Sequence, residues 1–320
     1  MSLRPVLLAA VSGVVLVAGL ALWLGSRPRE RDHRIVSVAV SSSGRWIAAG
    51  TRAGSITVLD RTSPNNLPRL LASAGDLNDL QFSPDERSLA IANRNLSTYD
   101  VKGLTLLRTQ RGDGRNYGTA RFSADGRRLL TITGAATIEV MDANSGEKQT
   151  SVCCSTIYGE TGFDPDGTMI VTAGHWPALW DARSGKLVRR LTGDREFETF
   201  GPIAFDPVRG WILMGSQDGR VYSWDLRTGQ RAATSSGRAG YVDGIATFRD
   251  SPWIAYGTRG GPIRLWNPDN GEERQVAGTA ATSNLVAGVE PNSVVFGTEA
   301  GFVELWDIAS SKLSQRYDLR

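Results

Sequence analysis

Short apolar runs alternate with clusters of turn residues along most of the chain, and the alternation repeats about every 41 residues. Each run, such as Leu89–Ala92 or Trp211–Met214, lacks the polar and apolar alternation of a half-exposed strand. The runs therefore predict strands that are buried on both faces. A further strand follows each run and ends in a pair of residues that recurs through the chain. These closing pairs are Leu59 and Asp60, Tyr99 and Asp100, Met141 and Asp142, Trp180 and Asp181, Trp224 and Asp225, Trp266 and Asn267, and Trp306 and Asp307.

Turn residues separate the strands at fixed places in the repeat. Phe122–Gly126 and Phe163–Gly167 each combine an aromatic residue with Asp and Gly shortly before a buried run. Asp hydrogen-bonds its own backbone and Gly accepts positive φ, so these clusters predict hairpin turns. Another turn, as at Ser184 and Gly185, precedes a polar stretch such as Lys186–Leu191, which is typical of an exposed outer strand. The repeat therefore predicts four strands, with the inner ones buried and the outermost polar.

These residues resemble the WD-repeat β-propeller family, whose blades have four strands and a Trp-Asp closing pair. The resemblance extends over residues 35–320 and implies an all-β, seven-bladed β-propeller of four-stranded antiparallel blades. Leu59, Tyr99 and Met141 replace Trp in the first three repeats. The chain has only two His, so the family's Asp-His-Ser-Trp hydrogen-bond network cannot form and packing has to hold each blade. Lys312–Tyr317 is expected to be the fourth strand of repeat seven, so we expect the ring to close by packing between blades.

The first 34 residues have a different character. Val6–Leu24 is 19 residues long without a charge, which as a helix at about 1.5 Å per residue nearly spans a hydrocarbon core of about 30 Å. We expect residues 1–26 to be one transmembrane α-helix that acts as an anchor, and residues 27–34 to be a charged linker. A cleaved secretory signal is the alternative, because Gly19–Ala21 fits a cleavage site. More Arg residues follow the span than precede it, which favours a single-pass protein with a cytoplasmic propeller, and export is the alternative.

Composition and charge narrow the functional class. The chain is 41% hydrophobic and 22% charged, which is enough apolar material for a substantial core. The net charge of +3 lies entirely in residues 1–34, which leaves 31 of the 36 basic and 31 of the 33 acidic side chains in the rest. A neutral propeller argues against a nucleic-acid partner. Two Cys and two His argue against a disulfide framework and a His-rich metal site.

The sequence carries no motif of a known catalytic class: it lacks a P-loop, a Gly-x-Ser-x-Gly elbow and a His-Glu-x-x-His helix. His175 lies beside Trp176 in the predicted loop between the second and third strands of blade four, where it can line one face of the ring. The alternative is a solvated loop His. Cys153 and Cys154 are expected to be reduced thiols, with a vicinal disulfide as the alternative. We therefore expect no catalytic residue, no metal and no cofactor.

Aromatic residues recur just before the first strand of four successive blades, with spacings of 41, 42 and 41. In a propeller this position lies at the rim of the central channel, on the face that also carries the loop of His175. We therefore predict a partner-binding surface there. The alternative is that the rings pack between neighbouring blades. The predicted binding residues are Tyr117, Tyr158, Phe200 and Tyr241, the charged residues Arg115, Glu160, Arg238 and Asp243, and His175 with Trp176.

These patterns predict a membrane-anchored, non-catalytic protein-interaction scaffold built on a WD-repeat-like propeller. Its expected partners are a protein or peptide, and the lipid bilayer through residues 6–24. The alternative is a channel-site enzyme or small-ligand sensor of the lactonase-like or quinoprotein-like propeller type. Titratable side chains grouped around one buried pocket would favour the enzyme, whereas aromatic residues and mixed charges would favour the scaffold.

Overall fold

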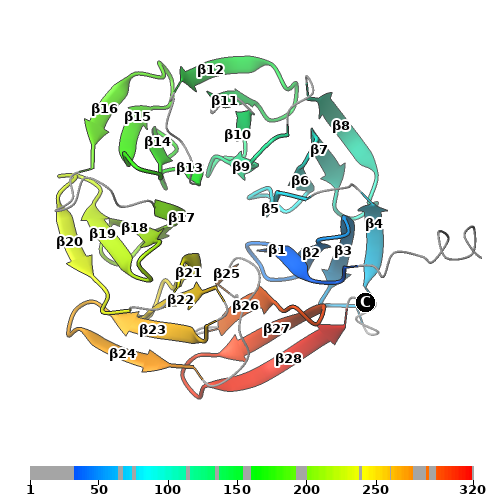
Figure 1. The fold of residues 1–320 in the computed structure, drawn as a ribbon. Coiled ribbons are helices and arrows are strands. Elements are labelled where there is room, and N and C mark those ends of the chain that lie inside the picture. Colours follow the sequence, from blue (N-terminus) through cyan, green and yellow to red (C-terminus); the bar gives the residue numbers. More distant parts are fainter. Residues whose placement is uncertain are drawn as a thin grey trace, which may run out of the picture. The chain divides into compact units, whose positions relative to one another are not determined.

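The computed structural model divides the chain into two units, Met1–Asp32 and His33–Arg320. It describes residues 32–63, 68–73, 77–112, 116–133, 137–153, 160–191, 200–237, 240–259, 261–276, 286–287 and 293–318. In the second unit, seven four-stranded antiparallel sheets follow one another around a ring (Figure 1). The all-β, seven-bladed propeller predicted from the repeat is therefore confirmed.

Each blade consists of four strands that are consecutive in sequence, with the first strand innermost (Figure 1). Blades 1 and 2 contain β1 (Ile35–Val40), β2 (Trp46–Thr51), β3 (Ser55–Asp60), β4 (Arg69–Ser73), β5 (Asp79–Phe82), β6 (Ser88–Ala92), β7 (Asn95–Asp100) and β8 (Leu106–Arg111). Blades 3 and 4 contain β9 (Arg121–Phe122), β10 (Arg128–Thr133), β11 (Thr137–Asp142), β12 (Lys148–Cys153), β13 (Thr161–Phe163), β14 (Met169–Thr172), β15 (Ala178–Asp181) and β16 (Leu187–Arg190). Blades 5 and 6 contain β17 (Phe200–Asp206), β18 (Trp211–Ser216), β19 (Val221–Asp225), β20 (Arg231–Thr234), β21 (Val242–Thr247), β22 (Ile254–Thr258), β23 (Ile263–Asn267) and β24 (Glu272–Gln275). Blade 7 contains β25 (Val286–Ala287), β26 (Ser293–Gly297), β27 (Phe302–Asp307) and β28 (Lys312–Asp318).

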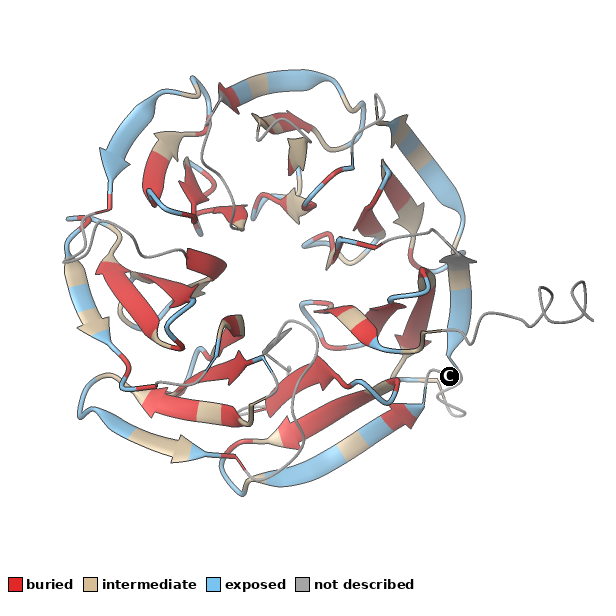
Figure 2. Ribbon diagram, in the orientation of Figure 1, coloured by how far each residue is buried: buried red, intermediate tan, exposed pale blue. Residues whose placement is uncertain are grey.

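Burial falls from the inner strands to the rim of the ring (Figure 2). All residues of the second strands β2, β22 and β26 are buried, whereas all four residues of the outer strand β16 are exposed. The reason is that each inner strand packs against a neighbouring blade on both faces. Between blades 4 and 5, for example, Val171 and Leu179 share one cluster with Met214 and Trp224. The prediction of doubly buried runs is confirmed. The outer strands are exposed, as predicted, but they are not purely polar, because several expose large aliphatic side chains: Leu70, Leu106, Leu107, Leu187, Val188 and Leu313.

The turn between the first two strands of a blade needs a residue with positive φ. Gly126 and Gly167 adopt a φ of 70° in blades 3 and 4, whereas Glu86 occupies this place in blade 2 with a φ of 61°. A left-handed backbone costs a residue with a side chain about 1–2 kcal/mol. The Glu86 carboxylate accepts hydrogen bonds from the hydroxyls of Ser42 (2.8 Å) and Ser43 (2.7 Å) in blade 1. These contacts offset the strain and tie the two blades together.

The closing pairs end the third strand of every blade, as the repeat predicts. Their polar residues are Asp60, Asp100, Asp142, Asp181, Asp225, Asn267 and Asp307. Asp181 accepts hydrogen bonds from the Ser184 amide (2.7 Å) and hydroxyl (2.6 Å). Asp307 of blade 7 accepts the equivalent two bonds from Ser310. These bonds hold the pKa of both carboxyls below the ordinary value. In blade 4, Trp180 Nε1 donates to Thr172 Oγ1 (3.1 Å), so one polar contact of the Trp persists without a His.

Side chains of the outer strands tie blades 1, 3, 4 and 6 to the blade that follows. Each donates a hydrogen bond to a backbone carbonyl in the turn after the next closing pair. The bonds run from Arg69 to Lys102 (3.0 Å), from Thr150 to Arg183 (2.7 Å), from Arg189 to Arg227 (3.1 Å) and from Arg274 to Ile308 (3.2 Å). The same kind of bond thus recurs at the interfaces between blades 1 and 2, 3 and 4, 4 and 5, and 6 and 7.

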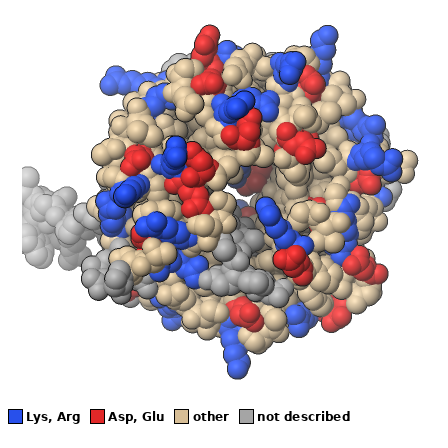
Figure 3. Space-filling view, turned by 180° about the vertical axis from the view of Figure 1, so that it is seen from behind, with Lys and Arg blue, Asp and Glu red and all other residues tan. Residues whose placement is uncertain are grey.

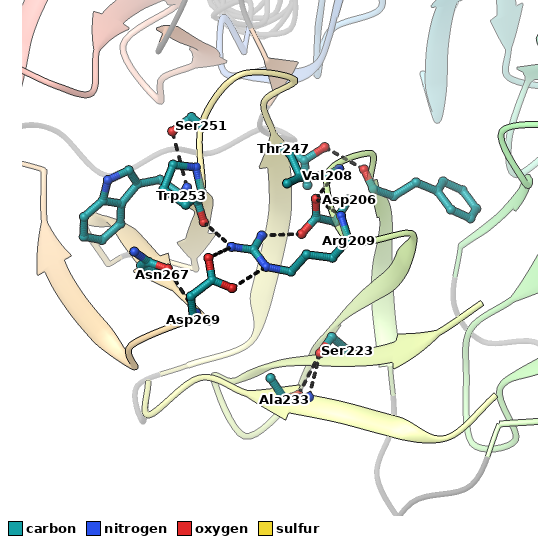
Figure 4. A network of polar contacts seen from close by, with 12 residues as sticks. Asp206, Val208, Arg209, Ser223, Ala233, Thr247, Ser251, Trp253, Asn267 and Asp269 are labelled. Atoms are coloured by element: carbon teal, nitrogen blue, oxygen red, sulfur yellow. Dashed lines mark hydrogen bonds and ion pairs between the residues drawn. The ribbon is translucent and has the colours of Figure 1, made fainter. Parts of the chain in front are cut away.

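A second tie joins blades 5 and 6 and is called the Arg209 clamp below (Figure 4). Arg209 donates from Nη1 to Asp206 (2.6 Å), and from Nε and Nη2 to the two carboxylate oxygens of Asp269 (2.8 and 2.5 Å). Nη2 also donates to the Pro252 carbonyl (3.2 Å). The guanidinium lies 5.5 Å from the Trp211 ring centroid, and only 9% of the side chain is exposed. All three guanidinium nitrogens of the clamp therefore have partners.

The ring closes between blades 7 and 1. β28 is the outermost strand of blade 7, which confirms the prediction for Lys312–Tyr317. Ile35 and Val38 of blade 1 pack in one buried cluster with Val303 and Leu305 of blade 7. Among the described residues, the last sheet contains only the consecutive strands β25 to β28, as expected for closure by packing between blades.

The transmembrane helix expected before the propeller is not supported by the structure. Among the residues that the structure describes, no helix is long and apolar enough to cross a membrane. Residues 6–24, for which the anchor and its signal-peptide alternative are predicted, lie outside the described part of the chain.

Candidate functional site at the channel mouth

One face of the ring carries the segments that lead into the first strands together with the connections between second and third strands. Backbone hydrogen bonds join the two kinds of segment: the Ala173 amide donates to the Glu160 carbonyl (2.9 Å), and the Arg259 amide donates to the Tyr241 carbonyl (2.8 Å). We call this the loop face, and the opposite one the turn face. The loop of His175 and the starts of the innermost strands therefore share a face, as predicted.

Charged side chains from successive innermost strands meet on the loop face. Asp79 of β5 forms an ion pair with Arg121 of β9 and also accepts hydrogen bonds from Thr119 Oγ1 (2.8 Å) and the Ala120 amide (3.0 Å). Arg121 Nη2 lies 3.7 Å from a carboxylate oxygen of Glu160, which directly precedes β13. A chain of alternating charges thus joins blades 2, 3 and 4.

Glu160 extends this chain to blade 5. Its other carboxylate oxygen accepts a hydrogen bond from the Ile203 amide (3.2 Å), and its own amide donates to the Gly201 carbonyl (3.2 Å). Burial raises the pKa of Glu160 above its ordinary value and Asp79 adds to the rise, while Arg121 and the Ile203 amide oppose it. The side chain nevertheless remains 36% exposed. Glu160 is therefore a carboxylate that a partner can reach.

Blade 6 completes the row of polar groups. Arg259 donates to both carboxylate oxygens of Asp243 (3.1 and 3.0 Å), and its guanidinium lies 5.4 Å from the Tyr241 ring centroid. The Tyr241 hydroxyl lies against Gly201, where a Cβ would collide with it. Burial, followed by the charge of Asp243, raises the pKa of Tyr241. The residues of the channel belt, as we call this row, are Asp79, Arg121, Glu160, Tyr241, Asp243 and Arg259.

The belt residues lie on or beside the strands of blades 2, 3, 4 and 6, and charges of both signs are also visible on the surface of the propeller. Figure 3 shows acidic and basic side chains interspersed around a hollow at the centre of the ring. Within the belt, three carboxylates face two guanidiniums. The described residues contain no group of three or more His, Cys, Asp or Glu side chains that could hold a metal ion.

The structure corrects part of the predicted aromatic surface. Tyr117 is 5% exposed and Phe200 is 3% exposed, because both rings pack between blades rather than facing solvent. Phe200 makes edge-to-face contacts with Tyr222 (5.4 Å) and Trp224 (5.2 Å). The alternative of packing between blades therefore holds for these two rings. Tyr241 remains partly exposed in the belt.

The other predicted residues divide into three groups. Glu160 and Asp243 belong to the belt, and His175 and Trp176 lie exposed on the loop between β14 and β15. The Trp176 side chain is 49% exposed, with the Arg190 guanidinium 5.7 Å from its ring centroid. Three of the predicted residues, Tyr158, Arg115 and Arg238, lie outside the described part of the chain, as do the side chains of Cys153 and Cys154.

Asp79, Arg121 and Arg259 belong to the belt but are not among the predicted residues. A signal for the first contact exists in the repeat, because Asp79 and Thr119 both lie three residues before the Phe of a turn, at Phe82 and Phe122. Equivalent places in successive blades are neighbours in a propeller. The ion pairs themselves depend on side-chain direction, which the repeat does not encode.

Comparisons with known proteins agree with the propeller fold. No family model matches the chain. Periodic tryptophan protein 2 of Saccharomyces cerevisiae is 22% identical over 90% of this chain and 32% of its own length. Protein tipD of Dictyostelium discoideum is 23% identical over 79% of this chain and 42% of its own. WD repeat-containing protein 55 of Mus musculus is 22% identical over 60% of this chain and 50% of its own. The chain thus spans about a third to a half of these relatives.

A solved structure has the same fold. A chain in the crystal structure of the mitotic checkpoint complex superposes with a TM-score of 0.73, covering 87% of this chain and 88% of its own, at 16% identity. The chain is therefore a seven-bladed propeller similar to WD-repeat proteins.

Proposed function

We propose that this propeller is a non-catalytic scaffold that binds a protein or peptide partner on its loop face. The observation that carries the proposal is the channel belt, which combines charges of both signs from blades 2, 3, 4 and 6 while Glu160 stays 36% exposed. Trp176, exposed on the same face, adds a large side chain of the kind that dominates binding energy at protein interfaces. A rigid ring that presents such a face suits binding without chemistry.

The comparisons support a protein partner in a general way. The relatives include WD-repeat proteins, and the structural neighbour comes from a multiprotein complex. The equal numbers of acidic and basic residues after residue 34 argue against nucleic acid as the ligand. Crosslinking and capture of proteins bound to the intact chain would identify the partner.

We further propose that residues 6–24 anchor the chain in a membrane, with the propeller on the cytoplasmic side. The support is the 19-residue uncharged stretch and the Arg-rich segment that follows it. A reporter fused after Arg320 tests the orientation. Activity of a reporter that works only outside the cytoplasm would overturn the cytoplasmic placement.

A channel-site enzyme or small-ligand sensor is the second candidate, and the raised pKa values of Glu160 and Tyr241 favour it. In the belt, however, Arg121 and Arg259 already face the carboxylates. Such pairing suits a mixed-charge binding surface better than a free acid or base. A small molecule that raises the melting temperature of the wild type but not of Glu160→Gln would favour this candidate.

Crosslinking and capture with the intact chain test the scaffold. Glu160→Gln and Trp176→Ala are expected to lower recovery of a loop-face partner at least tenfold. Arg87→Ala, which removes an exposed cation of the opposite face, is the matched control and should leave recovery unchanged. Equal recovery with all three variants would place the binding surface elsewhere.

A further inference from the structure

The outer strand of blade 4 differs from an ordinary solvent-facing edge because apolar and basic side chains follow one another along it. β16 is the outermost strand of its sheet, with β15 on one side. Leu187 is 44% exposed and Val188 is 49% exposed. The unpaired backbone N–H and C=O groups of a strand edge form a template for a further strand, and exposed aliphatic side chains favour its docking. Among the described residues, no strand pairs with the outer edge of β16.

The charge around β16 is strongly positive. The hairpin from residue 181 to residue 190 carries Arg183, Lys186, Arg189 and Arg190 against one carboxylate, Asp181. Asp181 is engaged by Ser184 in the turn. The hairpin therefore has a formal charge of +3 within a propeller whose total charge is zero.

The outer strands of blades 5 and 6 lack this combination, whereas β8 in blade 2 also exposes Leu106 and Leu107, beside Arg108 and Arg111. In blade 6, β24 and its turn carry Asp269, Glu272 and Glu273 against Arg274, and no large aliphatic side chain of this strand is exposed. In blade 5, β20 exposes only Ala232 and Thr234. The hairpin of β16, with a formal charge of +3, is more basic than the corresponding segment of β8, where Lys102, Arg108 and Arg111 stand against Asp100, and only the β16 edge ends beside the exposed Trp176.

The loop-face end of β16 carries an aromatic side chain. Leu191 donates its amide to the Pro177 carbonyl (2.8 Å), which holds the end of the strand beside the loop of Trp176. The Arg190 guanidinium lies 5.7 Å from the centroid of the exposed Trp176 ring. A segment that follows the strand would meet this ring after passing the two aliphatic side chains.

We propose that β16 binds an extended, acidic segment of a partner protein, which adds to blade 4 as a fifth antiparallel or parallel strand. This deepens the proposed scaffold function and rests on it. Backbone hydrogen bonds supply the pairing, Leu187 and Val188 contact alternate aliphatic side chains of the segment, and the basic residues select for Glu or Asp. The same positive charge disfavours pairing with the β16 edge of another copy.

Fluorescence anisotropy with the full chain in detergent micelles tests this. The probe is a short labelled peptide of alternating Glu and Val, and the comparison probe alternates Lys and Val. The acidic peptide is expected to bind at least tenfold more tightly than the basic one. Val188→Glu should lower the affinity for the acidic peptide at least tenfold. Lys186→Glu, which lies farther from the core, is a second variant that should also lower this affinity. Ala232→Glu on β20 is the matched control and should bind like the wild type.

Three results would overturn the inference: no binding of the acidic peptide to the wild type, equal binding of both peptides, or unchanged binding by both Val188→Glu and Lys186→Glu. Melting temperatures equal to that of the wild type show that the variants are folded. Loss of the loop-face partner with Glu160→Gln is measured in parallel. If that loss is seen while the acidic peptide does not bind, the scaffold stands and the assignment of β16 fails.

Discussion

The Arg209 clamp and the channel belt both join blades through ion pairs, but they differ in how completely the charges are satisfied. In the clamp, Arg209 is 9% exposed and every guanidinium nitrogen has a hydrogen-bond partner. In the belt, Arg121 is 21% exposed and stands 3.7 Å from Glu160, which is itself 36% exposed. Arg209 offers little to a partner, because each of its guanidinium nitrogens is already engaged. Glu160 is paired at a longer distance, so a cation of a partner can bind it.

Both regions consist of ion pairs, but the degree of burial and pairing distinguishes a structural contact, the clamp, from a binding surface, the belt. Removing a saturated buried charge leaves its partners desolvated, so its effect falls on stability. Removing a carboxylate that is only partly buried, such as Glu160, leaves fewer desolvated partners behind, so its effect falls mainly on binding. The predictions below test this division from the largest effect on stability to the smallest.

Replacement of Arg209 by Leu is expected to lower the free energy of unfolding by about 3 kcal/mol. The reason is that Asp206, which is 3% exposed, would keep its charge without a cation. The urea midpoint of the full chain measures the effect. Arg87→Ala removes an exposed guanidinium 3.9 Å from Asp85 and should change stability by less than about 0.5 kcal/mol. Equal midpoints for the two variants would contradict the structural role of the clamp.

Replacement of Gly201 by Ala tests the blade 5 and blade 6 side of the belt. A Cβ at this position would collide with the Tyr241 hydroxyl, so the ring or the strand has to move. Overpacking of this kind lowers stability by about 1–3 kcal/mol. Tyr241→Phe removes the colliding oxygen and should restore part of the loss in the double variant. A double-mutant cycle of melting temperatures measures the coupling, and strictly additive effects would show that the two residues are independent.

Replacement of Glu160 by Gln should raise stability at neutral pH slightly, because the neutral amide removes a partly buried charge, while it lowers partner affinity about tenfold, or about 1.4 kcal/mol. The amide oxygen of Gln can still accept the Ile203 amide, as the carboxylate does. Because the pKa of Glu160 is raised in the folded state, the ionised form is disfavoured there, and stability should fall as pH rises through that pKa. The variant should lose this pH dependence above pH 4.5, as followed by melting temperature. An unchanged pH profile would contradict the burial of Glu160.

The fold could be predicted from the sequence because every blade repeats the same pattern of strand and turn residues. Doubly buried runs, turn residues and closing pairs such as Trp224 and Asp225 recur at a nearly constant spacing. The strand assignment in one repeat therefore supports the assignment in the others. Seven independent repeats of one pattern leave little room for another architecture. Closure of the ring followed from a single segment, Lys312–Tyr317, which has a place only as the last outer strand.

The site could be predicted only in part, because the repeat gives the position of a residue in its blade but not the direction in which its side chain points. Tyr117, Phe200 and Tyr241 occupy equivalent places, yet the first two point into the interfaces between blades and the third lies in the belt. The size of the neighbouring residues decides between these directions, as the contact of Tyr241 with Gly201 shows. The ion pair of Asp79 with Arg121 is hidden for the same reason, since both residues read as ordinary surface charges along the chain.

The pair of Arg45 and Asp60 sharpens the comparison because its geometry resembles the clamp while its exposure resembles the belt. Arg45 donates from Nε (3.1 Å) and Nη2 (2.8 Å) to the two carboxylate oxygens, but its side chain is 48% exposed. The hydrogen bonds from Arg45 and then Thr62 lower the pKa of Asp60 from 3.8 to about 2. A lowered folded pKa means that the stabilisation is complete above 3.8 and is lost as pH falls through about 2. Asp60→Asn should therefore lower stability by less than about 1 kcal/mol at pH 7, and the difference from the wild type should vanish near pH 2, as measured by urea midpoints. A loss as large as that of Arg209→Leu would show that two-point geometry, and not burial, sets the strength of these ties, and the division between clamp and belt would then fail.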